Sequence, residues 1–183
     1  LIVHLLQSTR DNIVAVVRSE SALQTLQRLT SPEGELSEAD SARLSLVVAD
    51  YTNVAQLQAA AQGCDRAVHL VGILKATAFA TYQAAHEDSC AALVEALAAT
   101  SVKHITYLSI VGSKPDAANA CLASKGQAEA ILAAGEAVLS LALKNAFHLV
   151  PNFLESSLKV RSNSWVQVWP FHLQIGFLYN HVK

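Results

Sequence analysis

The sequence predicts an α/β domain built on a doubly wound parallel sheet, and three observations lead to this class. Short runs of apolar, β-branched residues recur along the chain, and segments with helical spacing of Leu and Ala separate them. Polar residues or glycine directly follow these runs, as expected where buried strands reach the edge of a sheet. Strands that alternate with helices pack as βαβ units around a parallel sheet. The 183 residues are 52% hydrophobic, which suits one domain with a sizeable core.

Each element is placed by its own pattern. The apolar runs are continuous rather than alternating, which is typical of strands buried on both faces. Asn53 offers an N-cap oxygen to one helix, and Gly135 is a suitable residue just beyond the end of another. The expected strands are Ile13–Val17, Leu44–Ala49, Ala67–Val71 and Ile105–Ile110. The expected helices are Leu1–Leu6, Ser19–Leu29, Val54–Gln62, Ala78–Thr100 and Lys125–Ala134.

Composition argues against several classes of function. The net charge of −2 gives no basis for a nucleic-acid partner. Cys64, Cys90 and Cys121 form no CxxC pair, which favours the cytoplasm or another reducing compartment over a disulfide scaffold. The seven histidines are scattered, so no metal site is expected. The chain starts at Leu1 and contains no Met, so we expect a processed chain or a fragment.

Residues at the ends of the predicted strands are the candidates for binding a dinucleotide, because open α/β sheets bind ligands beyond the carboxyl ends of their strands. Arg18 favours the 2′-phosphate of NADP(H) over the free hydroxyl of NAD(H), although it could equally be a solvated surface residue. The Asp50 carboxylate and nearby backbone, after the second strand, could contact adenine, or Asp50 could simply start a turn. Gly72, after the third strand, leaves room for a nucleotide, or simply ends the strand. The candidates are Arg18, Ser19, Asp50, Tyr51, Val71 and Gly72.

Ser109 and Lys125 are the candidates for chemistry. A hydroxyl can hold a reacting carbonyl oxygen, and a lysine can anchor the nicotinamide ribose and lower the pKa of a neighbouring phenol. The residue four before Lys125 is Cys121, a weak hydrogen-bond donor that is also a common small core residue. The set Ser109, Cys121 and Lys125 is therefore interpreted as a degenerate catalytic site.

No glycine-rich phosphate loop is present. The seven glycines, at 34, 63, 72, 112, 126, 135 and 176, do not give the spacing GxGxxG or GxxGxxG. Such a loop normally places backbone N–H groups around the pyrophosphate at a helix N-terminus. We therefore expect a Rossmann-like fold whose first strand and Gly-rich loop are missing, with Leu1–Leu6 as the remainder of the first helix.

Four segments, VAVVRS, VVADYTN, AVHLVGIL and the run from Thr106 to Leu132, resemble the short-chain dehydrogenase/reductase superfamily in its extended and atypical (NmrA-like) branches. Together with TYQAAHEDS they are most similar to the branch of the NADPH-binding accessory subunit of respiratory complex I. The resemblance covers about residues 1–135 and implies a bound NADP(H). It also implies a structural or sensing role, with a protein partner in a respiratory or quinone-linked assembly. Two alternatives stay open: an active NADP-dependent oxidoreductase or epimerase, and a fragment that binds no nucleotide.

The carboxyl-terminal part departs from this pattern. Residues 1–136 are expected to form a truncated dinucleotide-binding domain, and residues 137–183 a divergent segment. Ala137–Leu143 could be a further strand. Beyond it, polar residues interrupt the apolar stretch, so no transmembrane segment is expected. Irregular packing on the sheet, contact with a membrane surface or partner, and a non-native end remain three alternatives for this segment.

Overall fold

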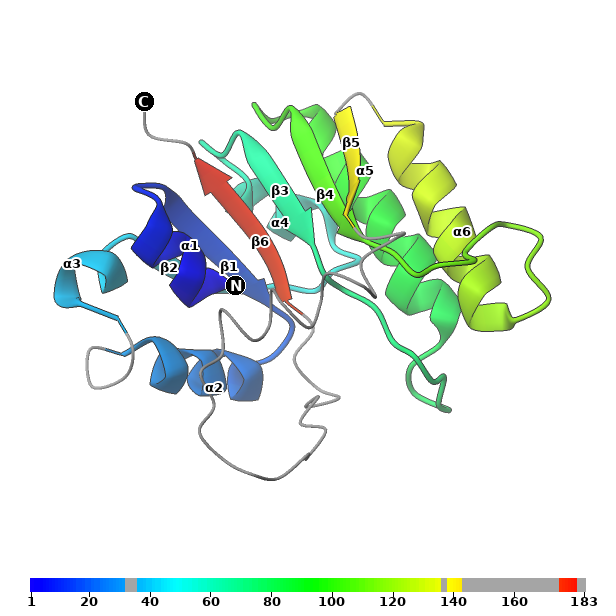
Figure 1. The fold of residues 1–183 in the computed structure, drawn as a ribbon, viewed down its shortest axis with the longest axis horizontal. Helices are drawn as coiled ribbons and strands as arrows, with labels where there is room; N and C mark the ends of the chain where they lie inside the picture. The colour runs from blue at the N-terminus through cyan, green and yellow to red at the C-terminus, as the bar shows by residue number, and fades with distance from the viewer. Residues whose placement is uncertain (32–35, 136–137, 143–174, 181–183) are drawn as a thin grey trace.

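The computed structural model describes residues 1–31, 36–135, 138–142 and 175–180, the last two stretches by their backbone (Figure 1). The strands are β1 (Asn12–Val17), β2 (Leu44–Val48), β3 (Arg66–His69), β4 (His104–Leu108), β5 (Val138–Ala142) and β6 (Ile175–Asn180). The helices are α1 (Ile2–Ser8), α2 (Glu20–Thr30), α3 (Glu38–Ser41), α4 (Val54–Ala60), η1 (Gln83–Asp88), α5 (Ser89–Ala98) and α6 (Ala120–Ala133).

The strands form one sheet in the order β2-β1-β6-β3-β4-β5. The pairs β1–β2, β3–β4 and β4–β5 are parallel. The carboxyl ends of these strands therefore meet at one edge of the sheet, which we call the carboxyl edge. The predicted α/β class with a parallel, Rossmann-like sheet is confirmed, as is a strand within the run 137–143.

Strand β6 is the exception to the parallel arrangement. It lies between β1 and β3 and is antiparallel to both, with Phe177 opposite Ala15 of β1 and Val68 of β3. In a doubly wound dinucleotide fold this central position belongs to the first strand of the chain. Here a strand from the carboxyl-terminal end fills it instead (Figure 1).

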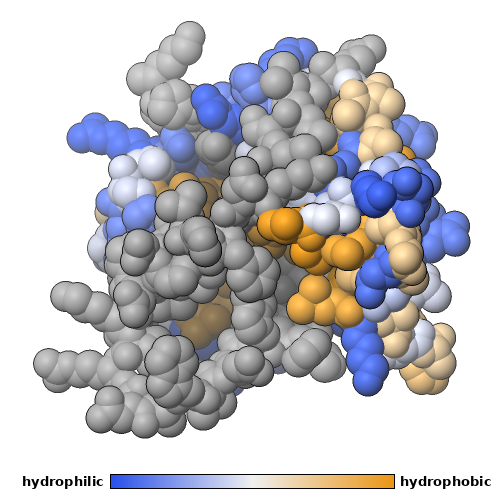
Figure 2. Space-filling model, turned by 45° about the vertical axis from the view of Figure 1, so that its right-hand side comes forward, coloured by the Kyte–Doolittle hydropathy of each residue, from blue (hydrophilic) through white to orange (hydrophobic). Residues whose placement is uncertain are grey.

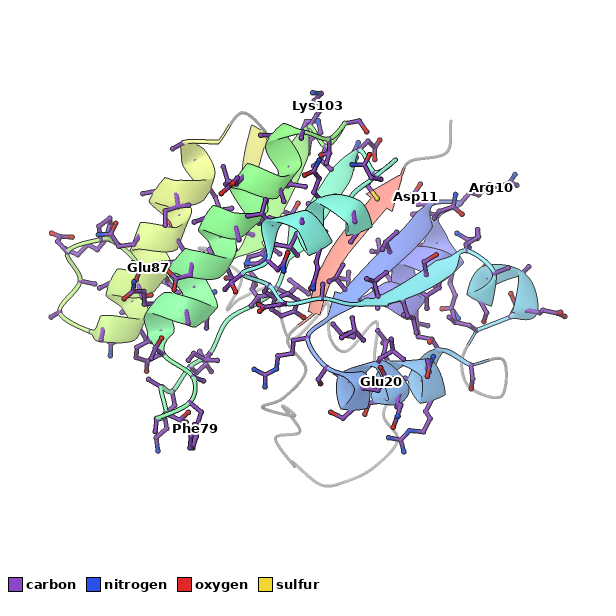
Figure 3. The ribbon with its side chains drawn as sticks, turned by 180° about the vertical axis from the view of Figure 1, so that it is seen from behind. Arg10, Asp11, Glu20, Phe79, Glu87 and Lys103 are labelled. Atoms are coloured by element: carbon purple, nitrogen blue, oxygen red, sulfur yellow. The ribbon has the colours of Figure 1, made fainter. Side chains whose placement is uncertain are left out.

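The sheet is covered on both faces. Helices α4, α5 and α6 lie on one face, which Figure 3 shows from that side, and residues of β1, β3 and β4 face them in the larger core cluster. A second cluster joins α1 and α2 to the opposite side of β1, where Ile13, Ala15 and Val17 are buried. The alternation along β1 explains the two cores, since Val16 points to the first and its neighbours to the second. In such a doubly wound arrangement, ligands bind beyond the carboxyl ends of the strands.

Three elements differ from the sequence prediction. The short helix α3 was not expected, because four residues carry too little periodicity. Helix α6 begins at Ala120 rather than Lys125, because the Asn119 side chain accepts hydrogen bonds from the first free N–H groups. The helix expected from Ala78 begins only at Gln83, because Thr77 and Ala80 bond to each other in a tight turn.

Apolar side chains are also exposed on the surface, as the face in Figure 2 shows. The large hydrophobic residues exposed in the described segments include Leu74, Phe79 and Val111, in the loops that follow β3 and β4. Phe79 stands at the tip of its loop, pointing away from the domain (Figure 3). Among the described residues, no helix combines the length and apolar character needed to cross a membrane.

Candidate functional site

Lys125 lies at the centre of the candidate site. Helix α6 carries it beneath the carboxyl edge, where its ammonium donates a 2.9 Å hydrogen bond to the carbonyl oxygen of Leu108, the last residue of β4. The same nitrogen lies 4.4 Å from the centre of the Tyr107 ring, in a cation–π contact. The side chain is buried, with 5% of the residue exposed. The sheet and helix together therefore hold this cation in one place.

Burial controls the ionisation of this region. It lowers the pKa of Lys125 to about 8, an effect that the nearby Cys90, Cys121 and Glu129 oppose. Burial, with a smaller contribution from the Lys125 charge, lowers the pKa of His86 to about 4 and that of His69 to about 3. At neutral pH the lysine is therefore the protonated member of this cluster, and both imidazoles are neutral.

Gly72 follows β3 and lies directly against Lys125. A Cβ atom added to this glycine would stand 3.0 Å from the Lys125 ammonium nitrogen and 3.3 Å from the His86 ring. The preceding residue, Val71, is buried in the core, so its side chain does not face the edge. The structure thus brings Gly72 and Lys125 together, although 53 positions separate them in the chain.

Cys121 lies one turn before Lys125 on α6 and is also buried. Its thiol donates to the carbonyl oxygen of Ile73, at an S–O distance of 3.6 Å. Burial raises the pKa of this thiol, and the nearby Lys125 only partly offsets the effect. A neutral, weakly donating thiol bonded to the main chain is poorly suited to proton transfer.

Ser109 follows β4, but its hydroxyl is occupied. It donates a hydrogen bond to the Glu129 carboxylate and lies 2.8 Å from the hydroxyl of Ser113. Ser113 also lies 2.6 Å from the same carboxylate oxygen. Neither Ser113 nor Glu129 was recognised as a site residue from the sequence. The available signal was that Glu129 lies four residues after Lys125 and therefore on the same face of α6.

Residues after β1 and β2 form the other half of the carboxyl edge. Arg18 is exposed, and Ser19 caps α2 by accepting from the N–H of Ala22 at 3.3 Å. The Asp50 carboxylate accepts from the N–H and hydroxyl of Thr52, and these bonds lower its pKa. The Tyr51 side chain links the segment after β2 to strand β1 at this edge.

Tyr51 is turned into the core rather than towards solvent. Its hydroxyl donates to the carbonyl oxygen of Val16 at 3.2 Å, and only 8% of the residue is exposed. Burial raises its pKa well above the usual value for a phenol, even though the adjacent Arg18 acts in the opposite direction. Any contact of this residue with a nucleotide would therefore come from its backbone.

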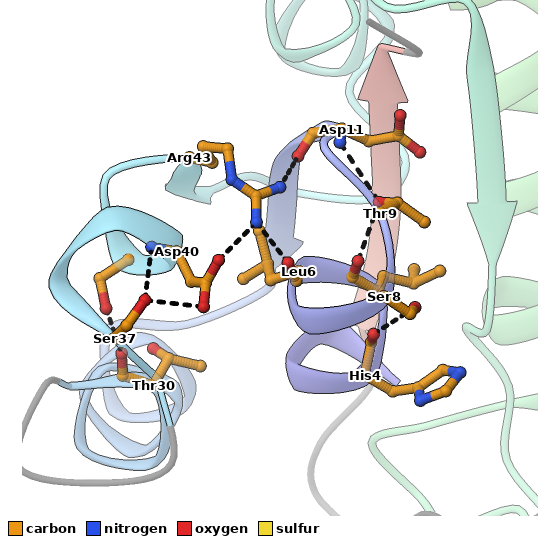
Figure 4. Close-up of polar contacts among 11 residues, drawn as sticks. His4, Leu6, Ser8, Thr9, Asp11, Thr30, Ser37, Asp40 and Arg43 are labelled. Carbon is orange, nitrogen blue, oxygen red and sulfur yellow. Dashed lines mark hydrogen bonds and ion pairs between the residues drawn. The ribbon is translucent and has the colours of Figure 1, made fainter.

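An open groove of about 810 Å³ lies near the other edge of the sheet, between the end of α1 and α3. In its wall, the Arg43 guanidinium donates to the carbonyl oxygens of Leu6 and Asp11 and pairs with the Asp40 carboxylate at 2.6 Å (Figure 4). These bonds occupy its guanidinium, so the groove offers less reason to expect an anionic ligand than the carboxyl edge does. The described residues contain no group of three or more His, Cys, Asp or Glu side chains suited to a metal ion.

Solved structures with the same fold include the following three proteins. Triphenylmethane reductase from Citrobacter sp., complexed with NADP(H), is 18% identical with a TM-score of 0.54, over 85% of this chain and 50% of that one. The NADPH-dependent quinone oxidoreductase QOR2 from Escherichia coli, complexed with NADPH, is 21% identical with a TM-score of 0.55, over 85% and 50%. Pen from Bacillus thuringiensis is 17% identical with a TM-score of 0.53, over 76% and 46%.

The chain thus spans about half the length of each of these proteins. At such low identity the likeness concerns the fold, which agrees with the architecture described above. A search of curated protein sequences gives no match. A family model described as NAD(P)H-binding matches residues 1–141. With this match over more than half of its length, and with the fold such domains adopt, the chain belongs to the NAD(P)H-binding family.

Proposed function

We propose that this protein binds NADP(H) across its carboxyl edge and acts as a structural or sensing binder rather than as an efficient reductase. The observation that carries the proposal is the contact between Lys125 and Gly72. A fixed cation lies beside a strand end that has no side chain. This arrangement suits the ribose hydroxyls of a nicotinamide nucleoside, which a lysine can bind while the glycine lets the ring approach the backbone.

The adenosine half would lie at the ends of β1 and β2. Arg18 is exposed there, and a guanidinium binds a phosphate group well, which supports a preference for NADP(H) over NAD(H). Asp50 and the backbone of Tyr51 lie at the end of the next strand, in a suitable place to border adenine. The backbone of Val71 and Gly72 would then border the nicotinamide half of the dinucleotide.

Two contacts support a binding role over catalysis. The Ser109 hydroxyl donates to Glu129, and the Cys121 thiol donates to Ile73. Reduction of a carbonyl needs a hydride from the nicotinamide, which the cofactor supplies, and a proton from the protein. Both candidate groups already donate to other acceptors. The resemblance to the complex I accessory subunit further suggests a partner in a respiratory or quinone-linked assembly.

An isothermal titration of the full chain with NADPH and with NADH tests the proposal. We expect NADPH to bind with about tenfold or greater preference, and Arg18→Glu to remove that preference. The loss of NADPH absorbance in the presence of a soluble quinone distinguishes a binder from an enzyme. Tight binding without oxidation supports the binder. Turnover that Lys125→Ala abolishes would favour the reductase or epimerase alternative, and no binding at all would favour the fragment.

A further inference from the structure

We propose that His86 is the positioning residue for the nicotinamide end of the site, holding the main chain at Gly72 and Ile73 in the conformation that receives the nucleotide. This inference rests on the proposed dinucleotide binding and adds a residue to it. His86 lies on η1, a segment that is separate from both the strand ends and helix α6. It lies fully buried behind the carboxyl edge.

The first step is the contact between His86 and Ile73. The Nε2 atom of the ring lies 3.0 Å from the backbone nitrogen of Ile73 and 3.0 Å from its carbonyl oxygen. A neutral imidazole nitrogen either accepts from the N–H or donates to the carbonyl, and both bonds fix the same residue. The chain has left β3 after His69, so this bond holds a residue that lies outside the strand.

The second step is the shared space at Gly72. A Cβ on Gly72 would stand 3.3 Å from Cδ2 and from Nε2 of His86, and 3.0 Å from the nitrogen of Lys125. His86 and Lys125 therefore flank the same glycine. Burial, with a smaller contribution from the Lys125 charge, keeps the imidazole uncharged. Removal of the ring would free both the Ile73 main chain and the lysine side chain.

The third step is the helix that delivers the ring. Segment η1, from Gln83 to Asp88, is a π-helix, whose wider turn changes which residues face the sheet compared with an α-helix. The Thr81 hydroxyl accepts from the N–H of Ala84 at 3.1 Å and so fixes its start. The Tyr82 ring stacks on His86 at 5.7 Å, while its hydroxyl donates to the carbonyl oxygen of Leu74. Such π-turns are frequent at functional sites, since they are costly to maintain.

The test compares two ligands in calorimetric titrations of the full chain: NADPH, and adenosine 2′,5′-bisphosphate, which lacks the nicotinamide riboside. We expect His86→Leu to weaken NADPH binding about tenfold, consistent with one lost hydrogen bond, and to leave the binding of adenosine 2′,5′-bisphosphate unchanged. His86→Gln, whose amide can still bond to Ile73, should retain most of the affinity. His104→Leu, at the exposed start of β4, is the matched control.

Equal losses for the two ligands, or no loss for either, would overturn the positioning role. If His86→Leu does not fold, the ring nitrogen resonances of the wild-type protein give the answer. NADPH should shift the His86 nitrogen signals and adenosine 2′,5′-bisphosphate should not, and the same response to both ligands would contradict the inference. A wild-type protein that binds neither ligand would overturn the proposed function itself, which separates the two failures.

Discussion

A Cβ atom on Gly72 would stand 3.0 Å from the ammonium nitrogen of Lys125, so a glycine after β3 and a lysine on α6 share one small space. This relationship connects the sheet edge with the helix that carries the candidate catalytic residues. A larger residue at this position would have to displace the end of the Lys125 side chain or the His86 ring. The cation and the exposed backbone together form the part of the edge to which we assign the nicotinamide riboside.

The first prediction concerns Gly72→Val. The added methyl groups would meet Lys125 and His86 and fill the space assigned to the nucleotide. We expect NADPH affinity to fall about tenfold or more, while the melting temperature changes by only a few degrees. Calorimetric titration and thermal unfolding measure the two effects. Ala76→Val, in the exposed loop that follows, is the control and should bind NADPH as the wild type does.

The second prediction concerns Gly126 in α6. A Cβ there would overlap the main chain of Lys114 and lie only 2.5 Å from the nitrogen of Pro115. Glycine to alanine inside a helix normally stabilises a protein by about 1 kcal/mol. At this position we expect Gly126→Ala to destabilise by about 2 kcal/mol or more, because backbone atoms cannot move aside as a flexible side chain can. Urea unfolding measures the change, and an increase in stability would show that the loop after β4 does not pack against α6.

The third prediction concerns the buried charge of Lys125. Its pKa is lowered from 10.5 in the unfolded chain to about 8 by burial, so folding is penalised at neutral pH, where the unfolded chain binds the proton more strongly. The penalty is fully present below about pH 8 and disappears as pH rises towards 10.5. We expect Lys125→Met to raise the free energy of unfolding at neutral pH by about 1–2 kcal/mol while weakening NADPH binding.

Urea unfolding over this pH range measures the effect, with Lys103→Met as the exposed control. The control should keep the rise in stability between about pH 8 and 10.5 that Lys125→Met removes. A loss of stability in Lys125→Met at neutral pH would show that the bonds to Leu108 and the Tyr107 ring outweigh the cost of burial.

The fourth prediction concerns acid unfolding. The pKa of His69 is lowered to about 3 and that of His86 to about 4, from 6.5. Between about pH 4 and 6.5, both rings are neutral in the folded protein and take up a proton when it unfolds. The stability that the neutral rings contribute is therefore fully present above about pH 6.5 and is lost as pH falls towards 4. We expect His69→Phe to flatten the dependence of stability on pH in this window, whereas the exposed His104→Phe should not.

The sequence was sufficient for the parallel strands and for the residues at their ends, because continuous apolar runs and the polar residues that follow them are local signals. It was not sufficient for β6. Ile175–Asn180 pairs with strands more than a hundred residues earlier, and no local pattern gives the partner or direction of such a strand. This strand fills the central place that the first strand takes in a doubly wound dinucleotide fold.

Local sequence signals likewise predict one part of the candidate site and not the other. Gly72 and Lys125 could be named because the strand end and the helix are each recognisable. The bond from Ser109 to Glu129 could not be predicted, because it depends on the relative rotation of a strand and a helix. The position of His86 could not be predicted for a similar reason: the π-helical turn changes which face of the segment meets the sheet.

The position of β6 leads to a fifth prediction. A chain ending at residue 174 would leave β1 and β3 without the strand that joins them. We expect its melting temperature to fall by about 10 °C or more, because the lost backbone hydrogen bonds belong to the centre of the sheet. A chain ending at residue 180 is the control and should melt as the full chain does. Unchanged melting of the shorter chain would show that the sheet does not depend on this strand.

Amide chemical shifts measured during an NADPH titration test the central claim most directly. The account predicts that the resonances of Ser19, Gly72 and Ser109 shift, because all three follow strands at the carboxyl edge. Those of Asp11 and Arg43, beside the groove at the other edge, should stay in place. Shifts confined to that groove, or no shifts at all, would contradict dinucleotide binding at the carboxyl edge.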